Sequence, residues 1–199
     1  MKRSSKACSF GVLLLACWGY AFAGPTIING SFEEGGFASR ITLPAGSTVI
    51  SGWVVLPAEI DWVDMLYEPS DGMLMIDLNG GGAELGVDPS GGIVQQLSGL
   101  KAGRWYRVLF DMAGNVDGGE KIKNLKVVVG LRLPGTVDPQ SNFRFNTEGL
   151  SRTDMGWRKK HIDFFFPGGG QPILEFRSLE SGNFGPFIDN VRIRRIWNP

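Results

Sequence analysis

The stretch Trp105-Tyr-Arg-Val-Leu-Phe-Asp-Met112 decides the fold, because its apolar residues recur at every second position. One face begins with Tyr106 and is entirely apolar. The other face mixes aliphatic, aromatic and charged side chains and holds Trp105, Arg107 and Asp111. Successive side chains of a β-strand point to opposite faces, so this period of two predicts a strand with one face in a core and one towards solvent.

Three later stretches alternate in the same way, and Gly-rich turn clusters recur along the whole chain. These stretches are His161-Ile-Asp-Phe-Phe-Phe166, Ile173-Leu-Glu-Phe-Arg-Ser178 and Val191-Arg-Ile-Arg-Arg-Ile196. Regular turns between short alternating runs are typical of an all-β sandwich or barrel, and no stretch keeps a helical period. Two packed sheets with inward apolar faces satisfy all the runs. The sequence therefore predicts an all-β, antiparallel sandwich, in which residues 24–199 form one domain without a linker or repeat.

Residues 1–23 have the three parts of a secretory signal peptide. They are a basic start, a short apolar stretch and the small-residue cleavage site Ala21-Phe-Ala23. The apolar stretch is too short to span a bilayer, and no other segment has transmembrane length. A second processing route is open, because Leu14-Leu-Ala-Cys17 resembles a bacterial lipobox that would leave a lipid on Cys17. The domain is therefore expected to be secreted, either soluble or anchored through Cys17.

Charge and composition argue against several functions. The chain has 20 basic and 20 acidic residues, and the leader takes three of the basic ones, so the domain is slightly acidic. Nucleic-acid binding normally needs a basic stripe, and an anionic membrane surface also attracts basic proteins. Both cysteines, Cys8 and Cys17, lie in the leader, which excludes a disulfide within the domain once the leader is removed. With His161 as its one histidine, the domain is also poor in the ligands that zinc favours.

Catalysis finds little support in the residues. His161 has no Gly-x-Ser-x-Gly motif near it, and Asp163 is a strand neighbour rather than a sign of a triad. A glycosidase needs two carboxylates across the bond to be cut, and acidic residues do gather near Trp62. They are Glu59, Asp61, Asp64 and Glu68, and we interpret them as polar positions of a strand and its following loop. The protein is therefore not expected to be an enzyme.

Glycan binding has better candidates. A sugar ring presents an apolar face on which Trp or Tyr can stack, while neighbouring polar groups bind the hydroxyls. Trp105 with Arg107 and Asp111 on one strand face is the best candidate platform, although Trp105 could instead pack under a loop. Trp62 is a second candidate whose side is undecided, and Gln95 is an amide that could bind a hydroxyl if it faces away from the core.

Two motifs at the ends of the domain suggest a metal site. Asn29-Gly-Ser-Phe-Glu33 opens the domain, and Gly185-Pro-Phe-Ile-Asp-Asn-Val191 closes it. Neighbouring end strands would bring the carboxylates of Glu33 and Asp189 onto one hard cation, and calcium accepts carboxylate and carbonyl oxygens in a flexible shell. The alternative is that Glu33 is a solvated turn residue and Asp189 caps a strand.

These motifs belong to a longer series that keeps its order along the domain. The series also includes Ile50–Trp53, Glu59–Trp62, Met75–Gly80, Gly92–Gln95, Trp105–Phe110, Ala113–Asn115, Gly156–Trp157 and Leu174–Ser178. It resembles the DUF642 and choice-of-anchor C proteins, which have a galactose-binding-like β-sandwich. The resemblance implies a secreted, non-catalytic jelly-roll domain that recognises extracellular or cell-wall polysaccharide. It also implies a structural calcium with Glu33, Asp189 and Asn29 as ligands. The alternative function is a structural or adhesive surface protein that contacts other proteins and binds no glycan.

Overall fold

The computed structural model describes residues 24–35, 40–80, 90–132 and 138–197. The expected signal peptide, with Cys8 and Cys17, lies outside these residues. The regular structure of the described residues consists of β-strands: β1 (Ile41–Leu43), β2 (Val54–Leu56), β3 (Ile60–Val63), β4 (Met75–Asp77), β5 (Gly92–Gln96), β6 (Arg104–Gly114), β7 (Ile122–Gly130), β8 (Gln140–Asn146), β9 (Arg158–Phe166), β10 (Ile173–Ser178) and β11 (Pro186–Ile196). In this part of the chain, no helix is long and apolar enough to cross a bilayer.

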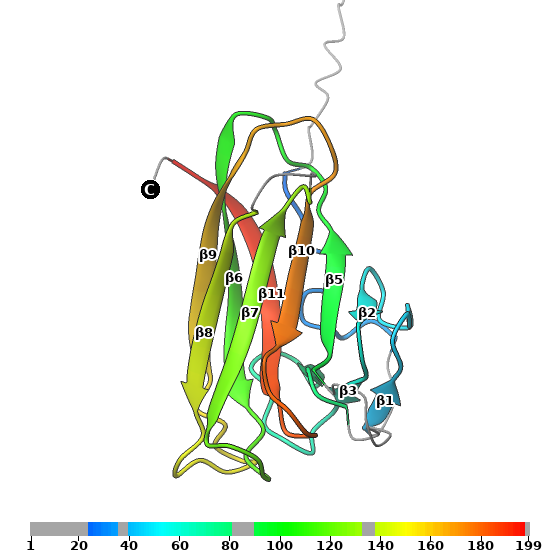
Figure 1. Cartoon of the computed structure of the whole chain (residues 1–199), viewed down its shortest axis with the longest axis vertical. Coiled ribbons are helices and arrows are strands. Elements are labelled where there is room, and N and C mark those ends of the chain that lie inside the picture. The colour runs from blue at the N-terminus through cyan, green and yellow to red at the C-terminus, as the bar shows by residue number, and fades with distance from the viewer. Residues whose placement is uncertain (1–23, 36–39, 81–89, 133–137, 198–199) are drawn as a thin grey trace, which may run out of the picture.

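The strands form two antiparallel sheets that pack face to face (Figure 1). The six-stranded sheet has the order β1-β3-β4-β11-β6-β9, and the five-stranded sheet has the order β2-β5-β10-β7-β8. From β4 onwards the chain passes from one sheet to the other at each connection, except at the β7–β8 hairpin. This arrangement confirms the predicted all-β antiparallel sandwich.

The four alternating stretches are strands, and their predicted faces are correct. The predicted strand at 173–178 coincides with β10, while β6, β9 and β11 extend beyond the predicted stretches. Along β6, Tyr106, Val108 and Phe110 are buried, whereas Trp105 and Arg107 are partly exposed. The period of two in the sequence therefore assigns this strand correctly.

Aromatic side chains join the two sheets. The Phe110 ring on β6 meets the Phe176 ring on β10 edge to face, with centroids 5.0 Å apart. It also meets Phe143 on β8 at 5.2 Å. Full burial of such a side chain stabilises the fold by about 1.5–3 kcal/mol. These contacts pack β6 against β8 and β10 in the core between the two sheets.

The N-terminal segment lies against the last strand. The Val191 amide donates to the Gly30 carbonyl at 2.8 Å. A Cβ atom on Gly30 would lie 2.0 Å from the Val191 carbonyl oxygen, so only glycine allows this approach. The first and last motifs of the domain are thus neighbours in space.

Two tryptophans also bind the backbone of this N-terminal segment. The Trp53 indole nitrogen donates to the Asn29 carbonyl at 3.1 Å, and the Trp62 indole nitrogen donates to the Phe32 carbonyl at 3.2 Å. Phe32 is fully buried with φ at 60°, and its ring lies 5.6 Å from that of Trp53. Since Trp62 belongs to the six-stranded sheet and Trp53 directly precedes β2, the segment closes one side of the sandwich.

We expect Gly30→Ala to lower the free energy of unfolding by about 1–3 kcal/mol, the usual cost of forcing an extra group into a packed site. Gly24→Ala is the matched control in the same segment, because a Cβ there meets nothing within 4 Å. Urea denaturation of the two variants checks the expectation. Equal midpoints would show that the contact between Gly30 and Val191 does not constrain the fold.

Candidate functional site

The outward face of β6, β9 and β11 carries an aromatic pair. The register of the sheet places Trp105 between Phe165 on β9 and Ile196 on β11. The Trp105 and Phe165 rings are 5.6 Å apart and tilted by 56°. Trp105 is partly exposed and Phe165 is 43% exposed, so both rings are accessible from solvent. This pair forms a small aromatic platform on the outward face, next to Ile196 on β11.

A guanidinium–carboxylate pair lies next to the platform. Arg107 donates to both carboxylate oxygens of Asp163, at 2.7 Å each. The hydrogen bonds from Arg107 are the main cause that lowers the pKa of Asp163, and the charges of His161 and Arg194 lower it further. Bidentate pairs of this kind have a fixed geometry, so the two side chains form a rigid polar group beside the rings.

Asp111 shares this face but is covered by a loop. The Ser70 hydroxyl donates to Asp111 Oδ2 at 2.5 Å, and the Asn190 side-chain amide donates to the same oxygen at 3.0 Å. Asp111 is buried as a result, whereas the sequence predicted it beside Trp105 and Arg107 on an open surface. Alternation along a strand cannot reveal a covering loop from a distant part of the chain.

The other two predicted ligand-binding residues also face the interior. Trp62 is only 1% exposed, with its indole nitrogen bound to the Phe32 carbonyl, so it offers no ring face to a ligand. The Gln95 side chain is buried and bridges the backbone of Ile28, accepting from its amide and donating to its carbonyl at 2.8 Å each. Gln96 is the exposed member of the pair. The surface site therefore keeps Trp105 and Arg107 from the predicted set.

The predicted metal ligands Glu33 and Asp189 hold one loop. Glu33 Oε1 accepts from the amides of Met73 and Leu74, at 2.9 and 2.8 Å. Asp189 Oδ2 accepts from the amides of Ser70 and Asp71, also at 2.9 and 2.8 Å. The two carboxylates thus approach residues 70–74 from the first and the last motif.

Asn29 and Asp189 have further local partners. The Asn29 side-chain oxygen accepts from the Glu34 amide at 3.0 Å, which closes a tight turn with φ of Asn29 at 48°. Asp189 is fully buried, and burial raises its pKa to about 7 against the lowering effect of its three backbone hydrogen bonds. The described residues contain no group of three or more acidic, histidine or cysteine side chains able to hold a metal. Calcium, for which two carboxylates and an amide were expected, stays a prediction.

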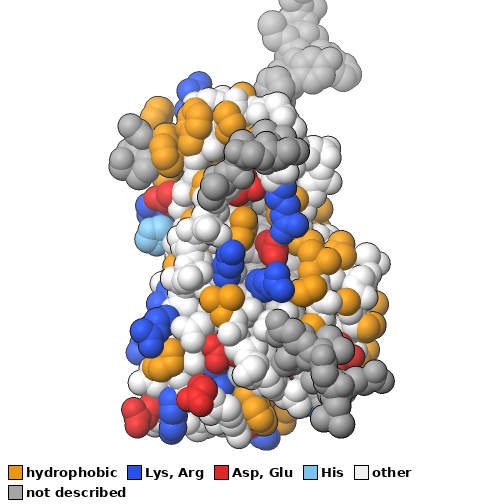
Figure 2. All heavy atoms as spheres, viewed as in Figure 1, with side chains coloured by type: hydrophobic (Ala, Val, Ile, Leu, Met, Phe, Trp, Pro, Cys, Tyr) orange, Lys and Arg blue, Asp and Glu red, His pale blue; other side chains and the backbone are white. Residues whose placement is uncertain are grey.

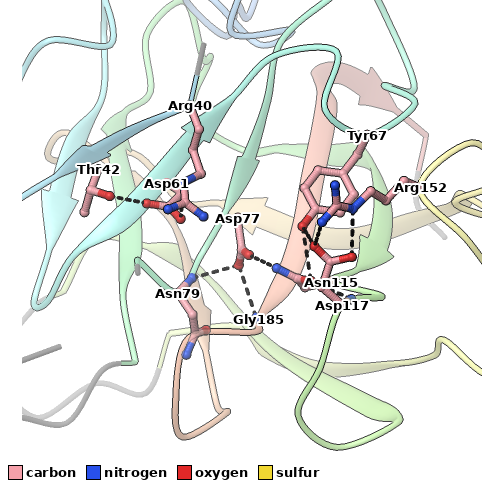
Figure 3. A network of polar contacts seen from close by, with 10 residues as sticks. All are labelled: Arg40, Thr42, Asp61, Tyr67, Asp77, Asn79, Asn115, Asp117, Arg152 and Gly185. Atoms are coloured by element: carbon pink, nitrogen blue, oxygen red, sulfur yellow. Dashed lines mark hydrogen bonds and ion pairs between the residues drawn. The ribbon is translucent and has the colours of Figure 1, made fainter. Parts of the chain in front are cut away.

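A buried carboxylate, that of Asp77 on β4, anchors a polar network (Figure 3). Asp77 accepts from the amides of Asn79 and Gly185, at 3.0 and 3.2 Å, and from the Asn115 side chain at 2.7 Å. Burial raises the pKa of Asp77 to about 8, and the neighbouring carboxylate of Asp61 adds to this effect. These residues lie in the motifs that carried the family resemblance, but the sequence assigned them no role.

The network continues towards the surface through Tyr67. Its hydroxyl donates to Asp117, which also pairs with Arg152 in a bidentate geometry at 2.8 and 2.7 Å (Figure 3). Asp61, expected on a polar surface, is buried and accepts from the Thr42 hydroxyl at 2.6 Å. These carboxylates are held by donors of the fold itself, which indicates a structural role.

His161 is exposed on the outward face of β9. Asp163, which shares this face, is engaged by Arg107 through both of its carboxylate oxygens. A catalytic triad needs a carboxylate that orients the histidine, and Asp163 does not do so here.

Residues 25–194 match the protein family described as DUF642, a protein of unknown function. The chain belongs to the DUF642 family. It is also 34% identical over 141 residues to halomucin of Haloquadratum walsbyi. The match covers 62% of this chain but only 2% of the length of halomucin.

Several solved structures share the fold of this DUF642 protein at low sequence identity. The CBM22-1–CBM22-2 tandem of Paenibacillus barcinonensis Xyn10C has a TM-score of 0.56 and 16% identity, over 90% of this chain and 47% of that one. TmCBM61 in complex with β-1,4-galactotriose has a TM-score of 0.51 and 17% identity, over 85% and 97%. The K1 cleaved adhesin domain of Lys-gingipain from Porphyromonas gingivalis W83 has a TM-score of 0.50 and 13% identity, over 80% and 100%. The DUF642 chain therefore has the β-sandwich fold of carbohydrate-binding modules.

Sequence reasoning did not include Phe165 and Asp163 in the candidate site. The signal was present, because the alternation in 161–166 already placed both on the solvent-facing side. Their contacts with Trp105 and Arg107 depend on the register between β6 and β9, which pairs Trp105 with Phe165 and Arg107 with Asp163. Register joins segments far apart in the sequence, so one strand alone does not reveal it.

The raised pKa of Asp77 predicts a pH-dependent stability. Its folded pKa of about 8 exceeds the ordinary value of 3.8, so the folded state binds more protons between these limits. The contribution of Asp77 to stability is complete below about pH 4 and is lost as the pH rises through about 8. Between about pH 4 and pH 8, the unfolding free energy of the wild type should therefore fall as the pH rises. We expect Asp77→Asn to reduce the slope of this fall by up to about 1.4 kcal/mol per pH unit.

Urea denaturation of both proteins at several pH values tests this expectation, and comparison with the wild type cancels all other titrating groups. Glu148→Gln removes an exposed carboxylate and should leave the slope unchanged. Parallel curves for wild type and Asp77→Asn would contradict the assignment.

Proposed function

We propose that this protein is a secreted, non-catalytic carbohydrate-binding domain that recognises extracellular or cell-wall polysaccharide. The observation that carries the proposal is the accessible pair of Trp105 and Phe165 beside the bidentate pair of Arg107 and Asp163. Aromatic rings offer contact area to the apolar face of a sugar, and fixed charged groups can bind its hydroxyls. Exposed aromatic surface next to fixed polar groups is also what marks interaction sites in general.

The other face of the sandwich is a weaker candidate. On the outward side of the five-stranded sheet, Lys/Arg and Asp/Glu side chains are interspersed among polar and apolar ones (Figure 2). The aromatic side chains of its described strands point inward, as Phe143 and Phe176 do towards Phe110. That face therefore lacks a ring on which a sugar could stack.

The comparisons and the leader support the proposed setting. Neighbours by fold include a module in complex with β-1,4-galactotriose and a xylan-binding domain. The leader at residues 1–23 favours secretion, and the anchored alternative at Cys17 keeps the domain on the outer side of a membrane.

A second candidate function is adhesion to another protein without glycan binding. Three exposed apolar residues lie in or shortly before the loop of residues 70–74 that Glu33 and Asp189 bind. Met65 is 71% exposed, Met73 is 56% exposed, and Leu66 is 41% exposed. Apolar surface of this kind is typical of contact sites between proteins. An adhesin domain is among the neighbours by fold.

Calcium remains part of the proposal. Glu33 and Asp189 supply the hard oxygen ligands that calcium prefers, and Asn29, in the same motif as Glu33, has an amide oxygen and a carbonyl. The two carboxylates act on one loop, so a cation bound there would stabilise the contact between the first and last motifs. Its role would be structural.

For the glycan site, we expect Trp105→Ala or Phe165→Ala to weaken polysaccharide binding by at least about 1 kcal/mol, or roughly fivefold, as for a central aromatic contact. Pull-down or calorimetry with a panel of polysaccharides measures the effect. Phe184→Ala is the matched control, because Phe184 is an exposed aromatic outside this face. Unchanged retention of both variants would exclude the platform, and a folded protein that no polysaccharide retains would favour the adhesive function.

For the metal, we expect calcium to raise the free energy of unfolding by about 3 kcal/mol at a hundredfold excess over its dissociation constant. Glu33→Gln and Asp189→Asn should abolish this increment, while the exposed Glu148→Gln should keep it. Both variants also lose charged acceptors for loop amides, so the decisive quantity is the difference in melting temperature between calcium and chelator. If the wild type melts at the same temperature in both, it has no calcium site of this kind.

A further inference from the structure

Basic side chains gather on the same outward face as Trp105 and Phe165. Arg192 and Arg194 on β11 are the cross-strand neighbours of Leu109 and Arg107, which places them on the outward side of the sheet. On the other flank, His161 lies opposite Leu109 on β9. Arg192, Arg194 and His161 are all exposed.

The Asp163 carboxylate, which also points outwards on this face, is already neutralised by an internal partner. Asp163 is bound by Arg107 through two hydrogen bonds of 2.7 Å. Arg192 and Arg194 form no ion pair within the part of the chain that the structure describes. Two guanidinium groups therefore remain available to an anion from outside.

A shallow hollow lies between these groups. It has a volume of about 300 Å³ and is lined by Leu109, Arg192, Ile193 and Arg194. Leu109 supplies an apolar contact, and the two arginines provide the charged part of the lining.

Apart from Asp163, the acidic groups on this outward face are separated from the hollow. Asp111 and Asp189 lie further along β6 and β11, where the loop containing Ser70 covers them. Glu68 and Asp71, which are exposed, belong to that covering loop. The outward face therefore has a covered end, where Asp111 and Asp189 are buried and Lys159 on β9 is exposed opposite Asp111, and an open end with Arg192 and Arg194. The aromatic pair belongs to the open end.

We propose that the glycan recognised by this face is a polyuronate, a polysaccharide whose sugar units carry carboxylates, with Arg192 and Arg194 binding the carboxylates and the Trp105–Phe165 pair contacting sugar rings. This inference rests on the proposed function. A guanidinium matches a planar carboxylate with two parallel hydrogen bonds, as Arg107 already does with Asp163 on this face. Residues two apart on a strand have Cα atoms about 6.6 Å apart, so both arginines serve the same stretch of this face.

The test compares polygalacturonate with its methyl ester, which keeps the backbone and loses the charge. We expect polygalacturonate to bind more tightly and to lose the advantage at high salt, because exposed ion pairs are screened. Arg192→Gln/Arg194→Gln should weaken binding of polygalacturonate by about two- to fivefold for each guanidinium removed, with little effect on the ester. Arg144→Gln is the matched control, because it removes an exposed arginine from the five-stranded sheet.

Each other outcome has a distinct meaning. Equal binding of polygalacturonate and its ester, with dependence on Trp105, would overturn the polyuronate inference and leave glycan binding intact. Dextran sulfate that binds as tightly as polygalacturonate, with the same dependence on the two arginines, would overturn carboxylate recognition in favour of simple charge attraction. Retention of the protein on none of these polymers would overturn the polyuronate inference, whereas the glycan function itself is decided by the panel of polysaccharides described above.

Discussion

The close approach of Gly30 to Val191 is the constraint on which the rest of the arrangement depends. It joins the first motif of the domain to its last strand, with an amide–carbonyl bond of 2.8 Å where no side chain fits. Once the two motifs are neighbours, Glu33 and Asp189 both reach the backbone amides of residues 70–74. That loop then covers Asp111, so a contact between two backbones decides which part of a sheet face stays open.

The six-stranded sheet consequently has one face with two kinds of surface. At the covered end, the Asp189 carboxylate accepts hydrogen bonds from backbone amides, which offset only part of the cost of burying its charge. At the open end, a rigid aromatic pair and a neutralised ion pair lie beside Arg192 and Arg194, which form no ion pair with the described residues. The covered half of these strands thus provides structural contacts, and the open half provides the proposed ligand contacts. A substitution in one half need not disturb the other.

Much of the fold follows from the sequence, because alternation reports burial directly. The runs in β6, β9, β10 and β11 gave the correct faces, and the positions of Trp105, Arg107, Asp163 and Phe165 on solvent-facing sides were available from them. Alternation along a strand does not show whether another segment of the chain covers one of its faces. Trp62 and Gln95 are buried because the N-terminal segment lies over them. Asp111 is buried because the loop that contains Ser70 covers it. Cross-strand register, which makes the ring pair and the ion pair, is likewise set by the assembled sheet.

The position of the chain ends has a mechanical consequence. Thr26 bridges to Ser98, and Ile196 pairs with Trp105, so the N-terminal segment and the end of β11 meet the two ends of the same short connection between β5 and β6 (Figure 1). A pulling force between these points acts across the strands rather than along them. The hydrogen bonds between β11 and β6 would then carry the load one after another, as in a zipper, instead of sharing it. A ligand that spans β9, β6 and β11 would bridge the strands that such a load separates.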